Sequence, residues 1–177
     1  MELWSLWACK ETAYKVISKS SARAPFLPRQ WSVQLNQSDS LFGKGEVIFP
    51  GANTVFVQFS RAESYVHCIG SDNLPDLDEI IWGIESLPES VAGKNNEPSL
   101  FVRECLYRRL ADVYQLNFRE MEIRRAEKNR ELQPPRLYYQ NKKAPFDISL
   151  SHDGQFVAYA YLVHGQGSGE FSRHIHR

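Results

Sequence analysis

Near the N-terminus, Trp7, Lys10, Glu11 and Lys15 combine an aromatic ring, two cations and a carboxylate in nine residues. They lie in a stretch from about residue 2 to residue 19 that contains no Gly or Pro and places apolar residues three or four positions apart, which predicts an amphipathic helix. Lys10 falls within the apolar stripe, so its ammonium group must extend to water or find a partner. Glu11 and Lys15 are one helical turn apart, and the simplest interpretation is a surface ion pair.

A second group of chemically capable residues, Ser149, Ser151 and His152, precedes Asp153-Gly154 near the C-terminus. Asp-Gly favours a tight hairpin turn, and strand alternation puts both serines on the same face. The spacing argues against a Ser-His-Asp hydrolase triad, because neighbours on one strand and turn cannot form the relay and no nucleophile-elbow glycines flank the serines. A hairpin with one polar side explains the spacing equally well.

The patterning around these groups predicts an α+β fold. Helices are expected near 2–19, 78–87 and 99–116, the last with Ser99 as its N-cap. Strands are expected in a meander at 31–35, 46–49, 54–59 and 65–69, at 121–125 and 136–139, and in a hairpin formed by 146–150 and 155–163. Residues 164–177, rich in Gly and Ser, are expected to form a flexible tail.

Composition narrows the function classes. The chain has 177 residues, 42% of them hydrophobic and 24% charged, and its formal net charge is zero, so no global charge attracts nucleic acid or an anionic membrane. Cys9, Cys68 and Cys105 stand far apart in the sequence, which argues against a disulfide framework and a zinc site. The N-terminus resembles neither a signal peptide nor a membrane span, so we expect a soluble, cytoplasmic protein.

Taken together, the two groups resemble the signature pair of the 4′-phosphopantetheinyl transferase superfamily. That pair is a Trp-x-x-Lys-Glu-Ala-x-x-Lys helix and a Ser-x-Ser-His-Asp-Gly turn leading into an Ala-rich strand; Thr12 replaces the alanine here. Their order matches the holo-acyl-carrier-protein synthase branch, and residues 120–124 followed by 133–137 are similar to its intervening strand and Gly-Lys-Pro turn.

The resemblance covers about residues 3–19 and 120–163. It implies a single phosphopantetheinyl transferase-like domain over residues 1–163, in which the Lys-Glu helix packs across an antiparallel sheet ending in the Ser-His hairpin. Residues 31–117 would then be a large central elaboration, first β and then α.

The resemblance also implies an activity. Family members transfer the 4′-phosphopantetheine arm of coenzyme A to a serine of an acyl or peptidyl carrier protein, with Mg²⁺, and release adenosine 3′,5′-bisphosphate. Glu11 would ligate the magnesium ion and act as a base through a metal-bound water, while Lys10 and Lys15 would hold phosphate oxygens. Glu11 and Lys15 are thus the implied catalytic residues.

Three further residues would bind the other end of coenzyme A. Ser151 and His152 match the family positions that contact the 3′-phosphate and adenosine, and Pro135 matches the proline that lines the adenine. Acidic carrier proteins would be attracted by a basic face, for which the candidates are Arg103, Arg108, Arg109, Arg124, Arg125 and Lys128. A solvated surface explains most of these six equally well, and a homo-oligomer is possible because single-copy relatives form trimers.

One expected feature is missing. Family enzymes carry a Gly-x-Asp segment upstream of the Lys-Glu helix, and its aspartate ligates magnesium; the chain as given starts almost on the helix. Three explanations remain open: a truncated sequence, a ligand from another subunit, or a catalytically inactive module that binds coenzyme A or a carrier protein. Asp147 and Asp153 are the weaker candidates for a substitute ligand.

Overall fold

The computed structural model describes residues 2–20, 25–39, 41–50, 53–91, 97–128 and 131–164. It confirms a mixed α+β fold with antiparallel sheets. The chain divides into two compact units, residues 1–80 and 81–177, which we describe one at a time. The unit boundary lies within the central segment 31–117, so that segment supplies a sheet to the first unit and a strand and a helix to the second.

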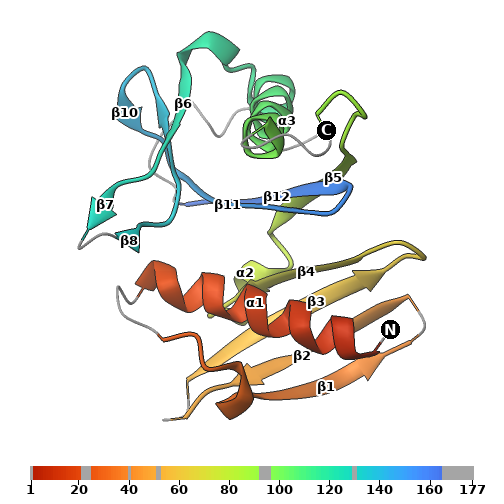
Figure 1. Ribbon diagram of the computed structural model, residues 1–177. Helices are drawn as coiled ribbons and strands as arrows, with labels where there is room; N and C mark the ends of the chain where they lie inside the picture. Colours follow the sequence, from red (N-terminus) through yellow and green to blue (C-terminus); the bar gives the residue numbers. More distant parts are fainter. Residues whose placement is uncertain are drawn as a thin grey trace. The chain divides into compact units, whose positions relative to one another are not determined.

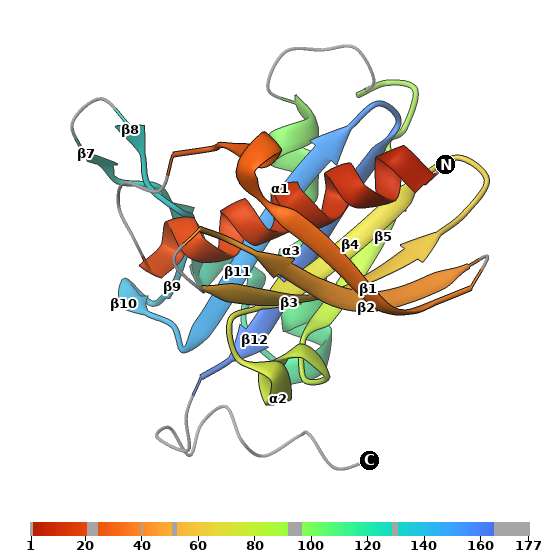
Figure 2. The same ribbon diagram turned by 90° about the horizontal axis from the view of Figure 1, so that it is seen from below.

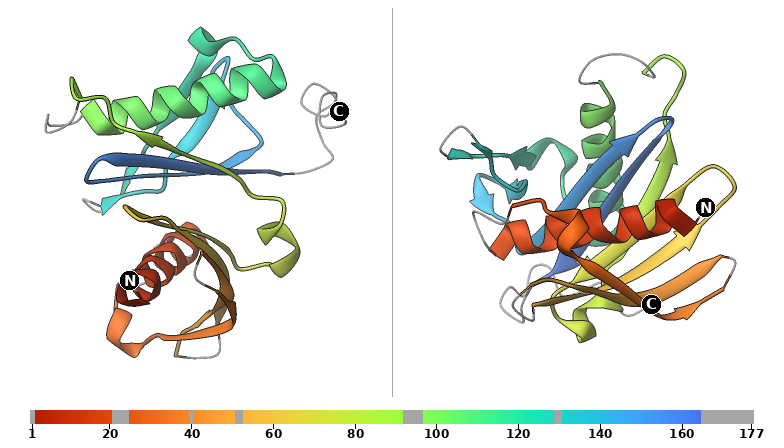
Figure 3. Two further views of the ribbon diagram at one scale, coloured as in Figure 1. Left: turned by 90° about the vertical axis from the view of Figure 1, so that its right-hand side faces the viewer. Right: turned by 60° about the horizontal axis from the view of Figure 1, so that its bottom comes forward.

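The first unit is one helix on a four-stranded sheet (Figure 1). Its sheet has the order β1-β2-β3-β4 with antiparallel neighbours, which confirms the predicted meander. The left view of Figure 3 shows this sheet curving around α1. The elements are α1 (Glu2–Ser20), η1 (Pro28–Gln30), β1 (Ser32–Ser38), β2 (Phe42–Ile48), β3 (Thr54–Arg61), β4 (Val66–Ser71) and α2 (Leu74–Leu77).

Small residues bring α1 close to its sheet. Cys9 and Ala13, one turn apart on the helix, are fully buried against a sheet face that includes Val57 and Phe59. α1 packs chiefly on β3 and β4 (Figure 2). The approach is closest at Gly70 of β4, where an added Cβ would lie 2.9 Å from Cγ2 of Thr12.

The second unit is built from a long helix and several short antiparallel pairings. Its sheets have the orders β11-β12-β5, β10-β9-β6 and β7-β8, and α3 packs on β11 and β12. The elements are β5 (Ile81–Ser86), α3 (Glu97–Tyr114), η2 (Phe118–Glu120), β6 (Met121–Arg124), β7 (Glu127–Lys128), β8 (Glu131–Leu132), β9 (Arg136–Tyr139), β10 (Lys142–Lys143), β11 (Phe146–Asp153) and β12 (Phe156–Val163).

Alternation along the hairpin explains the core of the second unit. Phe146 and Ile148 of β11 are buried on the same face as Tyr161 of β12, and this face meets Leu106 and Leu110 of α3. The predicted hairpin is thus confirmed, with its buried and polar faces as expected.

Three of the expectations about these elements are wrong, and a fourth lies outside the described residues. The helix expected at residues 78–87 is wrong, because residues 81–86 form β5 and pair with β12. Ser99 is not an N-cap, since α3 already begins at Glu97. The sheet beneath α1 is also not the sheet that ends in the Ser-His hairpin, which is covered by α3. The expected tail beyond His164 lies outside the described residues.

Candidate functional site

Lys10, Glu11 and Lys15 all lie on the continuous helix α1, as the sequence predicts. Because successive residues are about 100° apart around a helix, Glu11 and Lys15 share a face and Lys10 points elsewhere. Glu11 is exposed, whereas Lys10 and Lys15 are half-buried. The three side chains therefore do not form a single cluster on α1.

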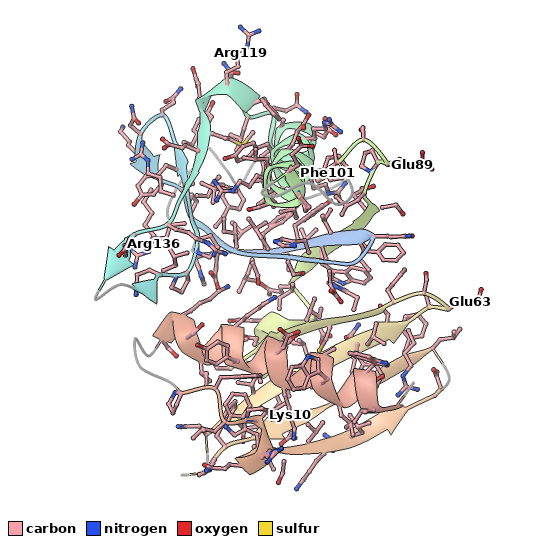
Figure 4. All side chains as sticks on the ribbon, in the orientation of Figure 1. Lys10, Glu63, Glu89, Phe101, Arg119 and Arg136 are labelled. Atoms are coloured by element: carbon pink, nitrogen blue, oxygen red, sulfur yellow. The ribbon has the colours of Figure 1, made fainter. Side chains whose placement is uncertain are left out.

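Lys10 has a structural partner. Its Nζ donates a hydrogen bond to the carbonyl oxygen of Pro28 at 2.6 Å, which links α1 to η1 (Lys10 is labelled in Figure 4). The ammonium group has three donor hydrogens, so this bond leaves donor capacity for an anionic ligand. The ammonium group of Lys10, which lies in the apolar stripe, is thus hydrogen-bonded to a backbone carbonyl.

Aromatic contacts hold the same segment on α1. The Phe26 ring lies edge-on to Trp7, Tyr14 and Trp31, with ring centroids 5.8, 5.0 and 5.3 Å away. Such pairs contribute about 0.5–1.5 kcal/mol each beyond the area they bury. Trp7, which the resemblance treats as a signature residue, therefore helps to position the chain between α1 and β1.

Lys15 lies near β4. Its charge acts on His67, whose pKa is lowered to about 4, first by burial and then by this neighbouring ammonium group. At neutral pH, His67 is consequently uncharged beside Lys15. Thr12, on the same helix, donates a hydrogen bond from Oγ1 to the carbonyl oxygen of Cys68 at 3.1 Å. This polar contact with β4 helps to position this part of α1.

Ser149 and Ser151 lie on β11 opposite small residues of β12. Ser149 pairs with Ala160 and Ser151 with Ala158, so each serine lies beside a small side chain. Both serines are half-buried.

His152 follows at the exposed end of β11. Successive strand residues point to opposite faces, so its imidazole and the Ser151 hydroxyl do not share a face. The hairpin turn begins at Gly154, whose φ of 54° lies in the region that favours glycine. A ligand that contacts both side chains must reach them around the exposed end of the hairpin.

Pro135 belongs to the same unit as the hairpin. It lies between β8 and β9 and is half-buried, and the amide of nearby Gln133 donates to the carbonyl oxygen of Ala126 at 2.8 Å. β9, which starts at the next residue, contacts β11. Pro135 therefore leads into a strand that is a neighbour of the one carrying Ser151.

The implied magnesium ligands are incomplete. No group of three His, Cys, Asp or Glu side chains able to hold a metal ion occurs among the described residues. Glu11 is an exposed carboxylate on α1, whereas Asp147 and Asp153 lie on β11 in the second unit. A protein site for Mg²⁺ usually offers one or two carboxylates together with substrate phosphate. The described residues do not by themselves make up such a site.

The arginines of the second unit are spread around α3 and β6, and several have local partners. Arg103 donates from Nη1 to the carbonyl oxygen of Ile123 at 3.2 Å. Arg108 pairs with Glu104, one turn away on the same helix. The ion pair of Arg108 with Glu104 favours the interpretation of Arg108 as part of a solvated surface. The bond of Arg103 to Ile123 helps to hold α3 to β6.

Arg124 and Arg125 also differ in their surroundings. Arg124 pairs with Glu122 and lies 4.4 Å from the centroid of the Tyr138 ring. The pKa of the Arg125 guanidinium is lowered by burial and by the nearby charge of Arg103. The side chain of Lys128, the remaining member of the predicted basic face, lies outside the described residues.

The spacing of residues in the sequence did not indicate one close pair of cysteines. Cys9 and Cys68 are far apart in the chain, yet their Sγ atoms lie 3.9 Å apart between α1 and β4. The two thiols are thus close in space although they are distant in sequence, and both are free. One signal could have indicated their proximity. Cys9 lies on the inner face of the helix, and Cys68 lies on a strand beneath it.

Comparison with known proteins found no match: no protein-family model fits the chain, and no curated protein and no solved structure is detectably similar to it. In the part of the chain that the structure describes, no helix has both the length and the hydropathy needed to cross a membrane.

Proposed function

We propose that the chain is a 4′-phosphopantetheinyl transferase of the holo-acyl-carrier-protein synthase type. The observation that carries the proposal is that both signature segments have the secondary structure that their chemistry requires. Lys10, Glu11 and Lys15 lie on one unbroken helix, and Ser149, Ser151 and His152 lie on a strand that ends in a glycine-containing turn.

The hairpin residues suit the adenosine end of coenzyme A. The Ser151 hydroxyl can donate to a phosphate oxygen, and the imidazole of His152 is exposed and can do the same. Ser151 and Ser149 are half-buried and pair with the small residues Ala158 and Ala160 of β12. Pro135 would pack on the adenine ring, because proline offers a rigid apolar surface.

The helix residues suit the pyrophosphate. Transfer requires the carrier serine to attack a phosphorus surrounded by anionic oxygens, so cations must offset that charge. Lys10 retains unused donor hydrogens beyond its bond to Pro28, and Lys15 supplies a second ammonium group. Glu11, exposed on the same face as Lys15, is the candidate base for the serine proton.

The partners follow from this reaction. The acceptor would be an acyl or peptidyl carrier protein and the donor coenzyme A, with magnesium supplying charge neutralisation when it is bound. We place the reaction in the cytoplasm. We propose a homo-oligomer in which a partner copy supplies a further metal ligand, since no group of three candidate ligands occurs among the described residues.

A second candidate is a module that binds coenzyme A or a carrier protein without transferring the arm. The observation that favours it is the same shortage of metal ligands among the described residues. It shares the roles of Ser151, His152 and the two lysines with the transferase, and it differs in giving Glu11 no chemical role.

Mass spectrometry distinguishes the two candidates. An apo acyl carrier protein is incubated with the full chain, coenzyme A and MgCl₂, and its mass is followed over time. A transferase adds the phosphopantetheine arm, and Glu11→Gln abolishes the addition. No added arm under any metal condition, together with coenzyme A binding that is insensitive to magnesium, would replace the transferase with the binding module.

A further inference from the structure

The two cysteines of the first unit form a close pair. Cys9 is fully buried on the inner face of α1, and Cys68 lies on β4 beneath it, with 3.9 Å between the Sγ atoms. Both are free thiols. A disulfide bond has an S–S distance of about 2.05 Å, so the two sulfurs would need to approach each other by about 2 Å.

The surrounding contacts already hold the two thiols against each other. Thr12 donates its hydroxyl to the carbonyl oxygen of Cys68 itself, at 3.1 Å, so the helix is fixed to β4 one turn away from Cys9. Gly70 lets the helix backbone approach the strand at the same level. Only a small shift of α1 or a rotation of the two side chains is then required for bonding.

The surroundings of the two thiols shift their pKa values in opposite directions. The Cys68 thiol donates a hydrogen bond to Cys9 Sγ, and this bond, with a smaller contribution from the charge of Arg61, lowers the pKa of Cys9. Arg61 is held in place by a hydrogen bond from its Nε to Ser5 Oγ at 2.8 Å. Burial raises the pKa of Cys68, which therefore retains its proton.

Other charged groups near the pair come from the same two elements. Lys15 of α1 acts on Cys68, lowering its pKa against the larger effect of burial. His67, adjacent to Cys68 on β4, is uncharged at neutral pH. Cys9, the sulfur that accepts the hydrogen bond, is therefore the thiol of the pair whose pKa is lowered, against the opposing effect of its burial.

We propose that Cys9 and Cys68 are a redox-active dithiol that hydrogen peroxide converts into an intramolecular disulfide linking α1 to β4. In the first step the Cys9 thiolate attacks one peroxide oxygen, the O–O bond breaks, and hydroxide leaves, giving a sulfenic acid on Cys9. Cys68 then attacks the Cys9 sulfur, the S–O bond breaks, and its proton leaves with the hydroxyl group as water. Two thiols lose two electrons, and one peroxide molecule is reduced to two water molecules.

A small oxidant suits this position because the sulfurs lie between a helix and a sheet, where a protein disulfide cannot reach them. The inference needs neither coenzyme A nor a carrier protein, and so it stands or fails apart from the proposed transferase. Cys105 provides an internal control: it is buried in the core of the second unit, and burial raises the pKa of its thiol.

Thiol counting by mass spectrometry tests the proposal on the full chain. The reduced protein is treated with hydrogen peroxide, the peroxide is removed with catalase, and the chain is unfolded and alkylated with N-ethylmaleimide. The untreated chain should carry three adducts, one for each cysteine, and the treated chain one, on Cys105. Peptide mapping should find residues 9 and 68 cross-linked, and dithiothreitol should restore all three adducts.

Matched variants extend this test. Cys9→Ser and Cys68→Ser should each lose the cross-link, whereas Cys105→Ser should keep it. If the buried Cys9→Ser chain does not fold, Cys68→Ser and the wild-type peptide map still decide the matter. Three adducts after peroxide treatment would overturn the proposal, as would oxygen addition that dithiothreitol cannot reverse or a cross-link between two chains.

Discussion

Lys10 makes a structural hydrogen bond and is also a proposed ligand-binding residue. Its bond to the Pro28 carbonyl anchors the segment between α1 and β1, and the resemblance assigns the same ammonium group to phosphate. Loss of function in a Lys10 variant is thus ambiguous unless stability is measured alongside it. The exposed neighbour Glu11 provides a reference that makes no such anchoring contact at Pro28.

Lys10→Met keeps the apolar stem and removes the donor. We expect the free energy of unfolding to fall by about 1.5 kcal/mol, because a hydrogen bond from a charged group is lost. Urea denaturation measures this change, with Glu11→Gln as a control that should stay within about 0.5 kcal/mol of the wild type. An unchanged urea midpoint for Lys10→Met would mean that the bond to Pro28 does not stabilise the fold.

His67 predicts a specific dependence of stability on pH. Its folded pKa of about 4 lies below the ordinary value of 6.5, so the unfolded chain binds more protons between these values. The stabilisation is fully present above pH 6.5 and is lost as the pH falls toward 4. From pH 7 to pH 5, this one group should lower the free energy of unfolding by about 2 kcal/mol.

The measurement is urea denaturation at pH 7 and pH 5 for the wild type, His67→Gln and His152→Gln. His67→Gln should show a smaller loss on acidification than the wild type, while exposed His152→Gln should behave as the wild type does. Equal losses in all three chains would show that His67 is not held in its neutral form by the fold.

At the scale of elements, the contact between α1 and β4 depends on the pairing of Thr12 with Gly70. A Cβ at residue 70 would lie 2.9 Å from Thr12 Cγ2 and 3.0 Å from the carbonyl oxygen of Phe56. Gly70→Ala should therefore cost about 1–3 kcal/mol of stability, as overpacking usually does.

Thr12→Ser separates the two functions of the threonine, because it removes the methyl group and keeps the hydroxyl that bonds to Cys68. Gly70→Ala should cost less in the Thr12→Ser background than in the wild type, and a double-mutant cycle of unfolding free energies measures the difference. The same cost in both backgrounds would place the strain elsewhere, at the Phe56 carbonyl.

Elements with local signals could be predicted from the sequence. The periodicity of α1, the glycine-separated strands of the meander and the last hairpin all depend on neighbouring residues. The hairpin turn lies one residue later than expected, at residues 154 and 155, because Asp153 pairs with Phe156. β5 could not be predicted in this way, since Ile81 and its neighbours become a strand only by pairing with β12 far along the chain.

Side-chain positions within the candidate site were predictable only in part. The alternation along β11 fixes the faces of Ser151 and His152 and follows from the strand period. The bond from Lys10 to Pro28 and the contact between Cys9 and Cys68 depend on how α1 docks on its own sheet and on η1. Tertiary packing of this kind leaves no local pattern in the sequence.

At the scale of the whole molecule, the chain has two compact units, each with its own hydrophobic core. The implied pyrophosphate residues Lys10, Glu11 and Lys15 belong to the first unit, and Ser151 and His152 belong to the second. The two signature segments therefore lie in different units.

The central claim is that this chain binds coenzyme A through the hairpin that carries Ser151 and His152. Calorimetric titration of the full chain with coenzyme A and with 3′-dephospho-coenzyme A tests it most directly, because the two ligands differ only in the 3′-phosphate. We predict saturable binding of coenzyme A about tenfold tighter than that of the dephospho form, since one good hydrogen bond to a charged group is worth this much. The difference should shrink in His152→Ala, because only Ser151 then remains to contact the 3′-phosphate. No heat of binding with coenzyme A, or equal affinities for the two ligands in the wild type, would contradict the account.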